Sequence, residues 1–239
     1  MKILILTLLM FFDFFHKKKI LKALNKLLEK NNNIIFDVGA HKGESIFLFQ
    51  KNFISSNFYS FEPLKDNFFK LKKNTLKFKQ NINYFNIALG KKKETKAIKE
   101  MAETSSSTLN DIDERSKYYK RKMFFLGINK KKKMYLKKNV EVDIASNIIK
   151  KFNVKKINLL KIDTEGYELN VIKGFGKEIE KVEVILLEHH YDLMIRKEYS
   201  FSDINKYLIL KGFVLKYKFK MPFRKTFEYI YSKSNKRNA

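Results

Sequence analysis

The sequence lacks cysteine and tryptophan and contains only two prolines among its 239 residues. Without cysteine, a disulfide scaffold, a cysteine-based zinc site and a cysteine nucleophile are all excluded. Pro63 and Pro222 are too few for a proline-rich or mucin-like chain. Arginine is also scarce, since it occurs only at positions 115, 121, 196, 224 and 237. Sequence-specific nucleic-acid readers commonly use arginine for bidentate contacts to bases, so this scarcity argues against that class.

Positive charge, in contrast, is abundant. Lysine and arginine number 51 against 25 acidic residues, which gives a formal net charge of +26. Such a charge is typical of proteins that bind nucleic acid or an anionic membrane. However, nearly all of it is lysine, and lysine, asparagine, isoleucine and phenylalanine share AT-rich codons. We interpret the excess as compositional drift and keep a polyanionic partner as the alternative.

Strand-like apolar runs alternate with helical patterns along most of the chain. This alternation predicts an α/β fold with a mostly parallel sheet, and a closing strand pair at 213–219 and 227–231 adds an antiparallel edge. Residues 91–140 are rich in Lys, Ser and Glu with weak periodicity, so we expect an insertion or mobile loop there, ending in a strand near 140–142. The predicted parallel strands are 34–38, 58–62, 82–89, 157–162 and 182–187.

The N-terminus carries an apolar run from Ile3 to Phe15, followed by an amphipathic helical pattern over 17–30. The run is shorter than the ~20 residues that cross a bilayer, and it lacks the basic start and cleavage site of a signal peptide. We therefore divide the chain into an N-terminal segment, 1–33, and a main domain, 34–239. The segment either packs on the domain or attaches it to a membrane surface, aided by Lys17–Lys19. The expected location is the cytoplasm, at its membrane surface in the second case.

Acidic residues stand at the ends of four predicted strands: Asp37, Glu62, Asp163 and Glu188. Ligands of open α/β sheets bind at the carboxyl ends of the strands, so these acids predict a ligand site on one rim. Glu62, at the end of the second strand, has the position at which a carboxylate accepts both hydroxyls of a ribose. The glycine spacing of the first turn is not that of a dinucleotide fold. Together these features indicate a nucleoside-containing cofactor.

Four motifs follow one another in the order of a known family. The most specific is Lys161-Ile-Asp-Thr-Glu-Gly-Tyr-Glu168; the others are Asp37-Val-Gly-Ala-His-Lys-Gly43, Phe61-Glu62-Pro63 and Asn86-Ile-Ala-Leu-Gly90, with Val171-Ile172-Lys173-Gly174 and Leu187-Glu188 after them. Over about residues 34–190 the chain resembles the FkbM-type methyltransferases, which depend on S-adenosylmethionine. The resemblance implies a class I methyltransferase fold, a Rossmann-like three-layer arrangement. Its sheet would have seven strands, mostly parallel, with one antiparallel edge strand.

The same resemblance implies cofactor contacts at particular residues. Glu62 would bind the ribose hydroxyls, and Asp163 would close the site near the methyl donor and the acceptor. Asn86 and Ala88 would border the adenine. The methionine and ribose side would be lined by Asp37, Gly39, Ala40 and Gly43.

Methyl transfer to a hydroxyl is helped by a general base. The candidate catalytic residues are Asp163, Glu165, Glu188 and His189, and His190 is a further candidate base. Histidine has the intrinsic pKa best suited to that work. Mixed carboxylate and imidazole ligands in this group would also suit Mg, Mn or Zn, although a metal is not part of the prediction.

The predicted function is O-methylation of a hydroxyl on a glycan, a glycolipid precursor or a related metabolite, as the resemblance implies. Two alternatives stay open. The charge favours an RNA methyltransferase, which would bind RNA in a salt-dependent way. The apolar N-terminus favours a non-catalytic membrane-surface module with the same fold.

Overall fold

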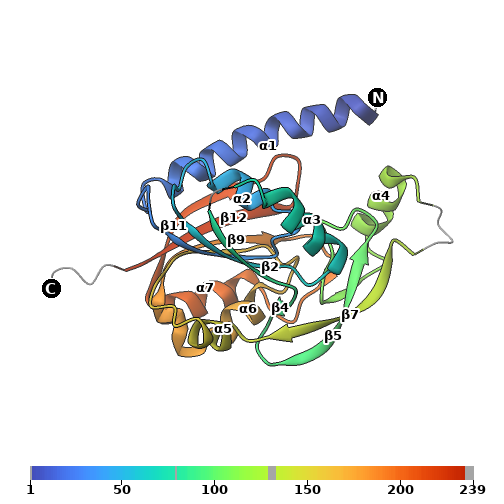
Figure 1. The fold of residues 1–239 in the computed structure, drawn as a ribbon. Helices are drawn as coiled ribbons and strands as arrows, with labels where there is room; N and C mark the ends of the chain where they lie inside the picture. Colours follow the sequence, from blue (N-terminus) through green and yellow to red (C-terminus); the bar gives the residue numbers. More distant parts are fainter. Residues whose placement is uncertain (1, 79, 129–132, 235–239) are drawn as a thin grey trace.

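A computed structural model describes residues 2–78, 80–128 and 133–234 of the chain, with side chains from residue 11 onward. Its centre is a twisted seven-stranded sheet (Figure 1). In sheet order the strands are β11 (Phe213–Lys220), β12 (Thr226–Lys233), β9 (Val182–His190), β8 (Ile157–Ile162), β1 (Ile34–Val38), β2 (Asn57–Phe61) and β3 (Asn81–Phe85).

The direction of the strands confirms the predicted fold class. β3, β2, β1, β8 and β9 pair in parallel, whereas β12 pairs antiparallel with both β9 and β11. The one antiparallel strand therefore lies one place in from the edge. The β11–β12 hairpin that creates it is the predicted closing strand pair, and it turns at Pro222.

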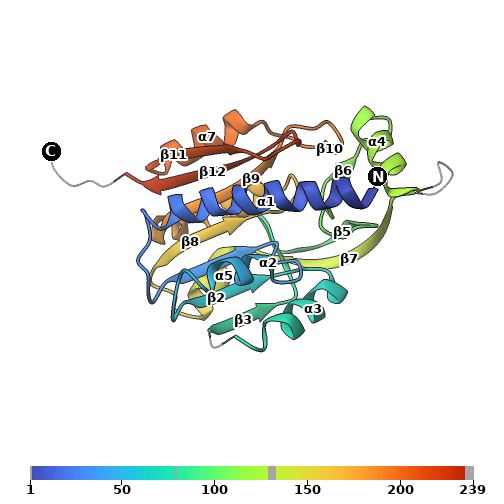
Figure 2. The same cartoon turned by 90° about the horizontal axis from the view of Figure 1, so that it is seen from above.

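Helices cover both faces of this sheet, which gives three layers (Figures 1 and 2). Alternation along the strands feeds two separate cores: Ile35 packs in the core on one face and Phe36 in the core on the other. The first face is covered by α1 (Lys2–Leu24), α2 (Glu44–Phe49) and α3 (Lys65–Thr75). The second is covered by α5 (Ala145–Lys151), α6 (Glu168–Gly174), the 3-10 helix η1 (Gly176–Lys181) and α7 (Phe201–Leu210).

Helix α1 differs from its prediction, because it is one continuous helix from Lys2 to Leu24 rather than an apolar segment followed by a helix over 17–30. Ile20, Ala23 and Leu24 are buried against the sheet, so the C-terminal part of the helix belongs to the core. The predicted apolar run falls partly on residues 3–10, whose side chains lie outside the described residues. Within the described part of the chain, no helix is long and apolar enough to cross a membrane.

Residues 91–140 are more regular than the predicted mobile loop. They form β5 (Glu94–Met101), β6 (Asp111–Ile112), α4 (Lys117–Leu126) and most of β7 (Tyr135–Asp143). β7 pairs with β5 and with β4 (Ala88–Leu89), and β6 pairs with β10 (Ile195–Arg196). This small layer has its own apolar cluster, which includes Met101, Tyr119 and Met194. The expected strand near 140–142 is present as the end of β7; the rest of the layer is hard to recognise in the sequence because lysines occupy both exposed and buried strand positions, such as Lys137 and Lys99.

Two strand boundaries also differ from the predictions. The expected third strand, 82–89, is two strands: β3 stays in the main sheet and β4 joins the small sheet. The expected fifth strand, 182–187, continues as β9 to His190. The second difference changes which side chains reach the candidate site.

Candidate functional site

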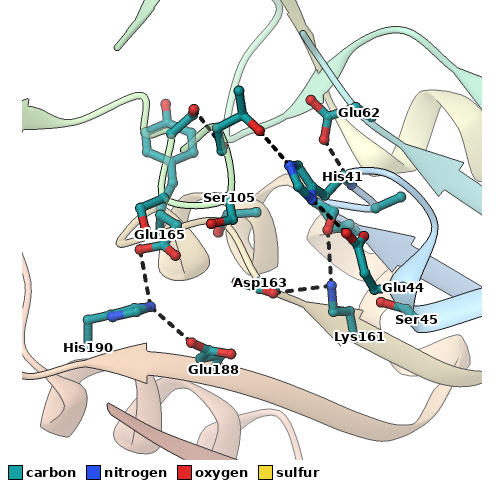
Figure 3. Close-up of a pocket in the computed structure, with 18 of the residues that line it drawn as sticks. His41, Glu44, Ser45, Glu62, Ser105, Lys161, Asp163, Glu165, Glu188 and His190 are labelled. Carbon is teal, nitrogen blue, oxygen red and sulfur yellow. Dashed lines mark hydrogen bonds and ion pairs between the residues drawn. The ribbon is translucent and has the colours of Figure 1, made fainter. Parts of the chain in front are cut away.

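A cavity of about 540 Å³ lies at the carboxyl ends of β1, β2, β8 and β9 (Figure 3). Small-molecule and cofactor sites have volumes of ~300–1,000 Å³, so the space suits a cofactor with an acceptor. Residues after the ends of the strands, together with the end of β9, form the floor. The β5–β6 segment with Ser105–Ser107 forms one wall, and α1 contributes Asp13, His16 and Lys17 to another. The rim predicted from the strand-end acids is therefore a real cavity.

The first turn brings β1 and β8 very close together. Gly39 has a φ of 78°, and a Cβ built there would lie 1.9 Å from the carbonyl oxygen of Asp163. The glycine is thus required by the protein's own backbone, whereas the sequence suggested close approach by a cofactor. Gly43 has a φ of 98° and caps the start of α2; it does not line the cavity, so the cofactor contact implied by the resemblance is not seen there.

Glu62 is fixed by backbone donors. Its Oε2 accepts a hydrogen bond from His41 N at 3.0 Å, and its Oε1 accepts one from Leu64 N at 2.9 Å. Burial raises the pKa of Glu62 to about 7, against these donors. A carboxylate has about four acceptor positions, and the two backbone donors with the side chain of Asn67 leave at least one of them for a ribose hydroxyl.

His41 connects the first turn to the small layer. Its Nδ1 lies 2.9 Å from Glu44 Oε1, and its Nε2 lies 2.8 Å from Thr104 Oγ1. Burial alone would raise the pKa of Glu44, but hydrogen bonds, among them the one from His41, lower it to about 2. The ionised Glu44 holds the imidazole, so the segment bearing Thr104 is attached directly to the first turn and to the side of the cavity that holds Glu62.

Lys161 links the ends of β1 and β8 from beneath. Its Nζ donates to Gly39 O at 3.0 Å and lies 3.3 Å from Asp37 Oδ1 and 3.4 Å from Asp163 Oδ2. Burial raises the pKa of Asp37, and the ammonium of Lys161 works in the opposite direction. The pKa of Lys161 itself is raised, because the two carboxylates outweigh its burial. Asp37 therefore serves this ion pair and does not line the cavity.

The opposite side of the cavity holds a compact group of Glu165, Glu188 and His190 (Figure 3). His190 Nε2 lies 3.2 Å from Glu165 Oε2 and 3.1 Å from Glu188 Oε1. Burial raises the pKa of Glu165 to about 8 and that of Glu188 to about 7. Burial would lower the pKa of His190, but the surrounding carboxylates raise it well above its usual range. The charge state of each of the three groups therefore affects the pKa values of the other two.

His189 is the main correction to the predicted catalytic residues. Because β9 continues to His190, neighbouring side chains alternate between the two faces of the sheet. Glu188 and His190 face the cavity, whereas His189 is 2% exposed on the other face, with Nδ1 3.4 Å from Glu168 Oε2. We therefore replace His189 by His190 in the candidate group.

The turn that carries Glu165 is held from both sides. Thr108 Oγ1 donates to Glu165 O at 2.6 Å, and the Tyr199 hydroxyl donates to Gly166 O at 2.8 Å. Gly166 N donates to Glu168 Oε1 at 2.6 Å. Glu165 has a φ of 50°, a left-handed conformation that these contacts stabilise. Glu168 is therefore buried and structural rather than exposed.

Asn86 also has a structural position. Its Nδ2 donates to Glu62 O at 2.9 Å and to Pro63 O at 3.0 Å, and the side chain does not line the cavity. Ala40, Ala88 and Asp163 do line it, as the resemblance implied. Sequence reasoning gave no role to Lys161 or Thr104. The role of Lys161 could have been suspected, because this residue stands in the most specific motif. Thr104 lies in the variable segment 91–140, where no motif indicates a role.

The Glu165, Glu188 and His190 group also has the spacing of metal ligands, since one donor atom from each lies within 4.8 Å of the others. The residues that the sequence analysis considered as possible metal ligands, without predicting a metal, included Asp163 and His189 as well. The structure brings Glu165 and Glu188 together with His190 instead. Either a cation or a proton between the two carboxylates can compensate their charge.

Solved structures resemble this fold at low sequence identity. Magnesium protoporphyrin IX methyltransferase from Synechocystis PCC 6803, solved with bound S-adenosylmethionine, is 10% identical, with a TM-score of 0.51 over 91% of this chain and 78% of that one. M. capricolum TrmK, in complex with S-adenosyl-homocysteine, is 13% identical, with a TM-score of 0.46 over 90% and 67%. A putative RNA methyltransferase from Pyrococcus horikoshii is 12% identical, with a TM-score of 0.48 over 93% and 83%. No curated protein sequence matches the chain significantly.

A family model describes most of the chain. The model of the methyltransferase FkbM domain matches residues 37–220, which include the glycine turn, Glu62, the Glu165 turn and His190. The match confirms the resemblance inferred from the motifs. Together with the fold, it also confirms a methyltransferase that uses S-adenosylmethionine. The chain belongs to the FkbM methyltransferase domain family.

Proposed function

We propose that this methyltransferase methylates a hydroxyl of a glycan, a glycolipid precursor or a related metabolite. The observation that carries the proposal is the Glu165, Glu188 and His190 group, which faces the same cavity as Glu62. A hydroxyl acceptor needs a proton acceptor, and this group supplies carboxyls with pKa values near neutrality.

The two sides of the cavity have separate roles. Bound S-adenosylmethionine would supply a sulfonium methyl group. Glu62 holds the ribose hydroxyls, and the turn from Gly39 to His41 limits where the rest of the cofactor lies. His190 keeps Glu165 and Glu188 together, so that one carboxylate takes the proton of the acceptor hydroxyl. Asp163 lies between the two sides.

The polar character of the acceptor side supports a sugar-like acceptor. Ser105–Ser107, Lys122 and the three members of the proton-accepting group line this side of the cavity. Such groups donate and accept hydrogen bonds with vicinal hydroxyls. The charge of +26 keeps RNA as the competing acceptor.

The cofactor assignment is tested by calorimetric titration of S-adenosylmethionine, and of S-adenosyl-homocysteine, into the purified chain. We expect micromolar binding that weakens by at least ~100-fold in Glu62→Ala, because two hydrogen bonds to a charged group are lost. Glu141→Ala, which removes an exposed acid on β7, serves as the matched control. Equal affinities in both variants would remove the ribose role of Glu62.

The acceptor class is tested by transfer of a radioactive methyl group to glycan and glycolipid fractions and, in parallel, to total RNA. We expect label in the glycan or glycolipid fraction that resists alkaline hydrolysis, as a methyl ether does, and that disappears in Glu165→Gln. Label in RNA alone would replace the proposed acceptor with nucleic acid.

A further inference from the structure

Helix α1 exposes aromatic side chains at a place where the fold does not need them. Phe11, Phe14 and Phe15 are 56%, 53% and 45% exposed. Phe223, at the tip of the β11–β12 hairpin, is 70% exposed and belongs to the same cluster, since its ring contacts that of Phe12 at a centroid distance of 5.1 Å. We call these four exposed rings the aromatic cluster. It joins two segments about 210 residues apart in the sequence.

The opposite face of the same helix turn is firmly attached to the domain. Asp13 accepts a hydrogen bond from Arg224 Nη2 at 2.9 Å, and His16 contacts Glu228 of β12. The polar side chains therefore point toward the sheet and the aromatic rings point away from it. This is the reverse of a helix that only covers a core.

Basic residues border the aromatic cluster. Lys17, Lys18 and Lys19 are exposed on the next turn of α1, and Lys225 is exposed on the hairpin. Lys18 Nζ lies 4.4 Å from the centroid of the Phe14 ring, so its aliphatic stem runs along the aromatic surface. Aromatic rings flanked by lysines match an interface at which apolar chains lie beneath anionic headgroups.

From this arrangement we propose that the aromatic cluster and its lysines dock the protein on an anionic lipid surface. The benefit of such docking for catalysis rests on the proposed function, in which the acceptor is a glycan or glycolipid hydroxyl. Asp13, His16 and Lys17 of α1, with Met221 and Arg224 of the hairpin, line the cavity. Docking therefore brings one wall of the cavity to the headgroup layer, where a membrane-anchored acceptor hydroxyl would be held.

Co-sedimentation with vesicles tests the docking surface. The probes are vesicles of phosphatidylcholine alone and of phosphatidylcholine with phosphatidylglycerol. We expect binding to the anionic vesicles that falls by ~10-fold or more in Phe14→Ser/Phe15→Ser/Phe223→Ser, because apolar burial in the interface is lost. Lys17→Gln/Lys18→Gln/Lys19→Gln should lower binding by a similar factor and reduce its salt dependence.

The matched control is Ile209→Ser/Leu210→Ser on α7. These side chains are 56% and 84% exposed, and α7 covers the opposite face of the sheet from α1 (Figure 1). We expect this variant to bind vesicles as the unaltered protein does. If the aromatic and control variants bind equally, net charge alone attracts the protein and the proposal fails. If the aromatic residues instead hold two copies together, size-exclusion chromatography with light scattering will show a dimer that these variants dissociate, which also overturns it.

The failure of this inference is distinguishable from that of the proposed function. S-adenosylmethionine titration reports on Glu62 and does not require vesicles, so the aromatic variants should keep the affinity of the unaltered protein. Normal cofactor binding without vesicle binding would reject only the docking surface. Vesicle binding without cofactor binding would reject the proposed function and leave a membrane-surface protein.

Discussion

The two sides of the cavity position their acids in different ways. On the cofactor side, two backbone N–H groups hold Glu62. On the acceptor side, Glu165 and Glu188 both contact the imidazole of His190. These two acids are therefore positioned by a side chain and not by backbone donors. Backbone donors stay in place when a neighbouring side chain changes, whereas a group of three titrating side chains changes together. The cofactor side should therefore tolerate substitution around it better than the acceptor side does.

Lys161, which links β8 to β1 through Asp37 and Gly39, gives the largest expected effect. Lys161→Met removes a buried cation and leaves Asp37 buried without its partner, so we expect the free energy of unfolding to fall by ~3–5 kcal/mol. Urea denaturation measures this. Lys156→Met, which breaks the exposed pair with Glu183, should cost less than ~1 kcal/mol. A double variant with Asp37→Asn should recover part of the loss; no recovery would mean that Asp37 does not need the ammonium.

Adjacent histidines sharpen the contrast between the cavity and the core. His190→Gln should lower kcat by ~100-fold or more, because the proton-accepting group loses its central member. Its cofactor affinity should stay unchanged. His189→Gln should lower the free energy of unfolding by ~1–3 kcal/mol through Glu168 while kcat changes little. The measurements are steady-state kinetics and urea denaturation, and the opposite pattern would restore His189 as the catalytic candidate.

The pH dependence of cofactor binding tests the ionisation of Glu62. Its pKa is raised to about 7, so below that pH the free protein holds a proton that must leave before the carboxylate accepts two hydroxyls. Affinity should therefore rise with pH, by up to ~10-fold per unit below pH 7, and level off above it. Glu62→Gln should bind weakly with no such rise. The measurement is calorimetric titration of the cofactor from pH 5.5 to 8.5. An affinity of the unaltered protein that does not change with pH would show that Glu62 binds the cofactor both protonated and ionised.

The smallest expected effect concerns the contact between the small layer and the first turn. Thr104→Val removes one hydrogen bond to His41, worth ~1 kcal/mol, so S-adenosylmethionine affinity should fall about fivefold. Thr95→Val removes an exposed hydrogen bond to Glu141 and should leave affinity unchanged. Calorimetry compares them. Equal affinities would mean that the cofactor side is independent of residues 91–140.

Much of the fold was predictable because apolar periodicity reflects local geometry. The strands at 34–38 and 157–162 and the closing strand pair around Pro222 are all present. Most of the small layer was not predictable, because its strands interleave lysines with the apolar residues, and a buried lysine such as Lys99 interrupts the alternation of polar and apolar positions. His190 reaches the cavity because β9 continues beyond the predicted strand 182–187 through residues 188–190, which pair with β12.

The sequence by itself determined the family, the acidic residues at the ends of the parallel strands and the glycine turn, because each of these is a property of a short contiguous segment. Only the tertiary structure decided which acids act together. Lys161 on β8 reaches Asp37 on the neighbouring strand β1, Thr104 reaches His41 across 63 positions, and Phe12 of α1 meets Phe223 near the other end of the chain. Each contact depends on the packing of segments that are distant in sequence, and no local pattern records that packing.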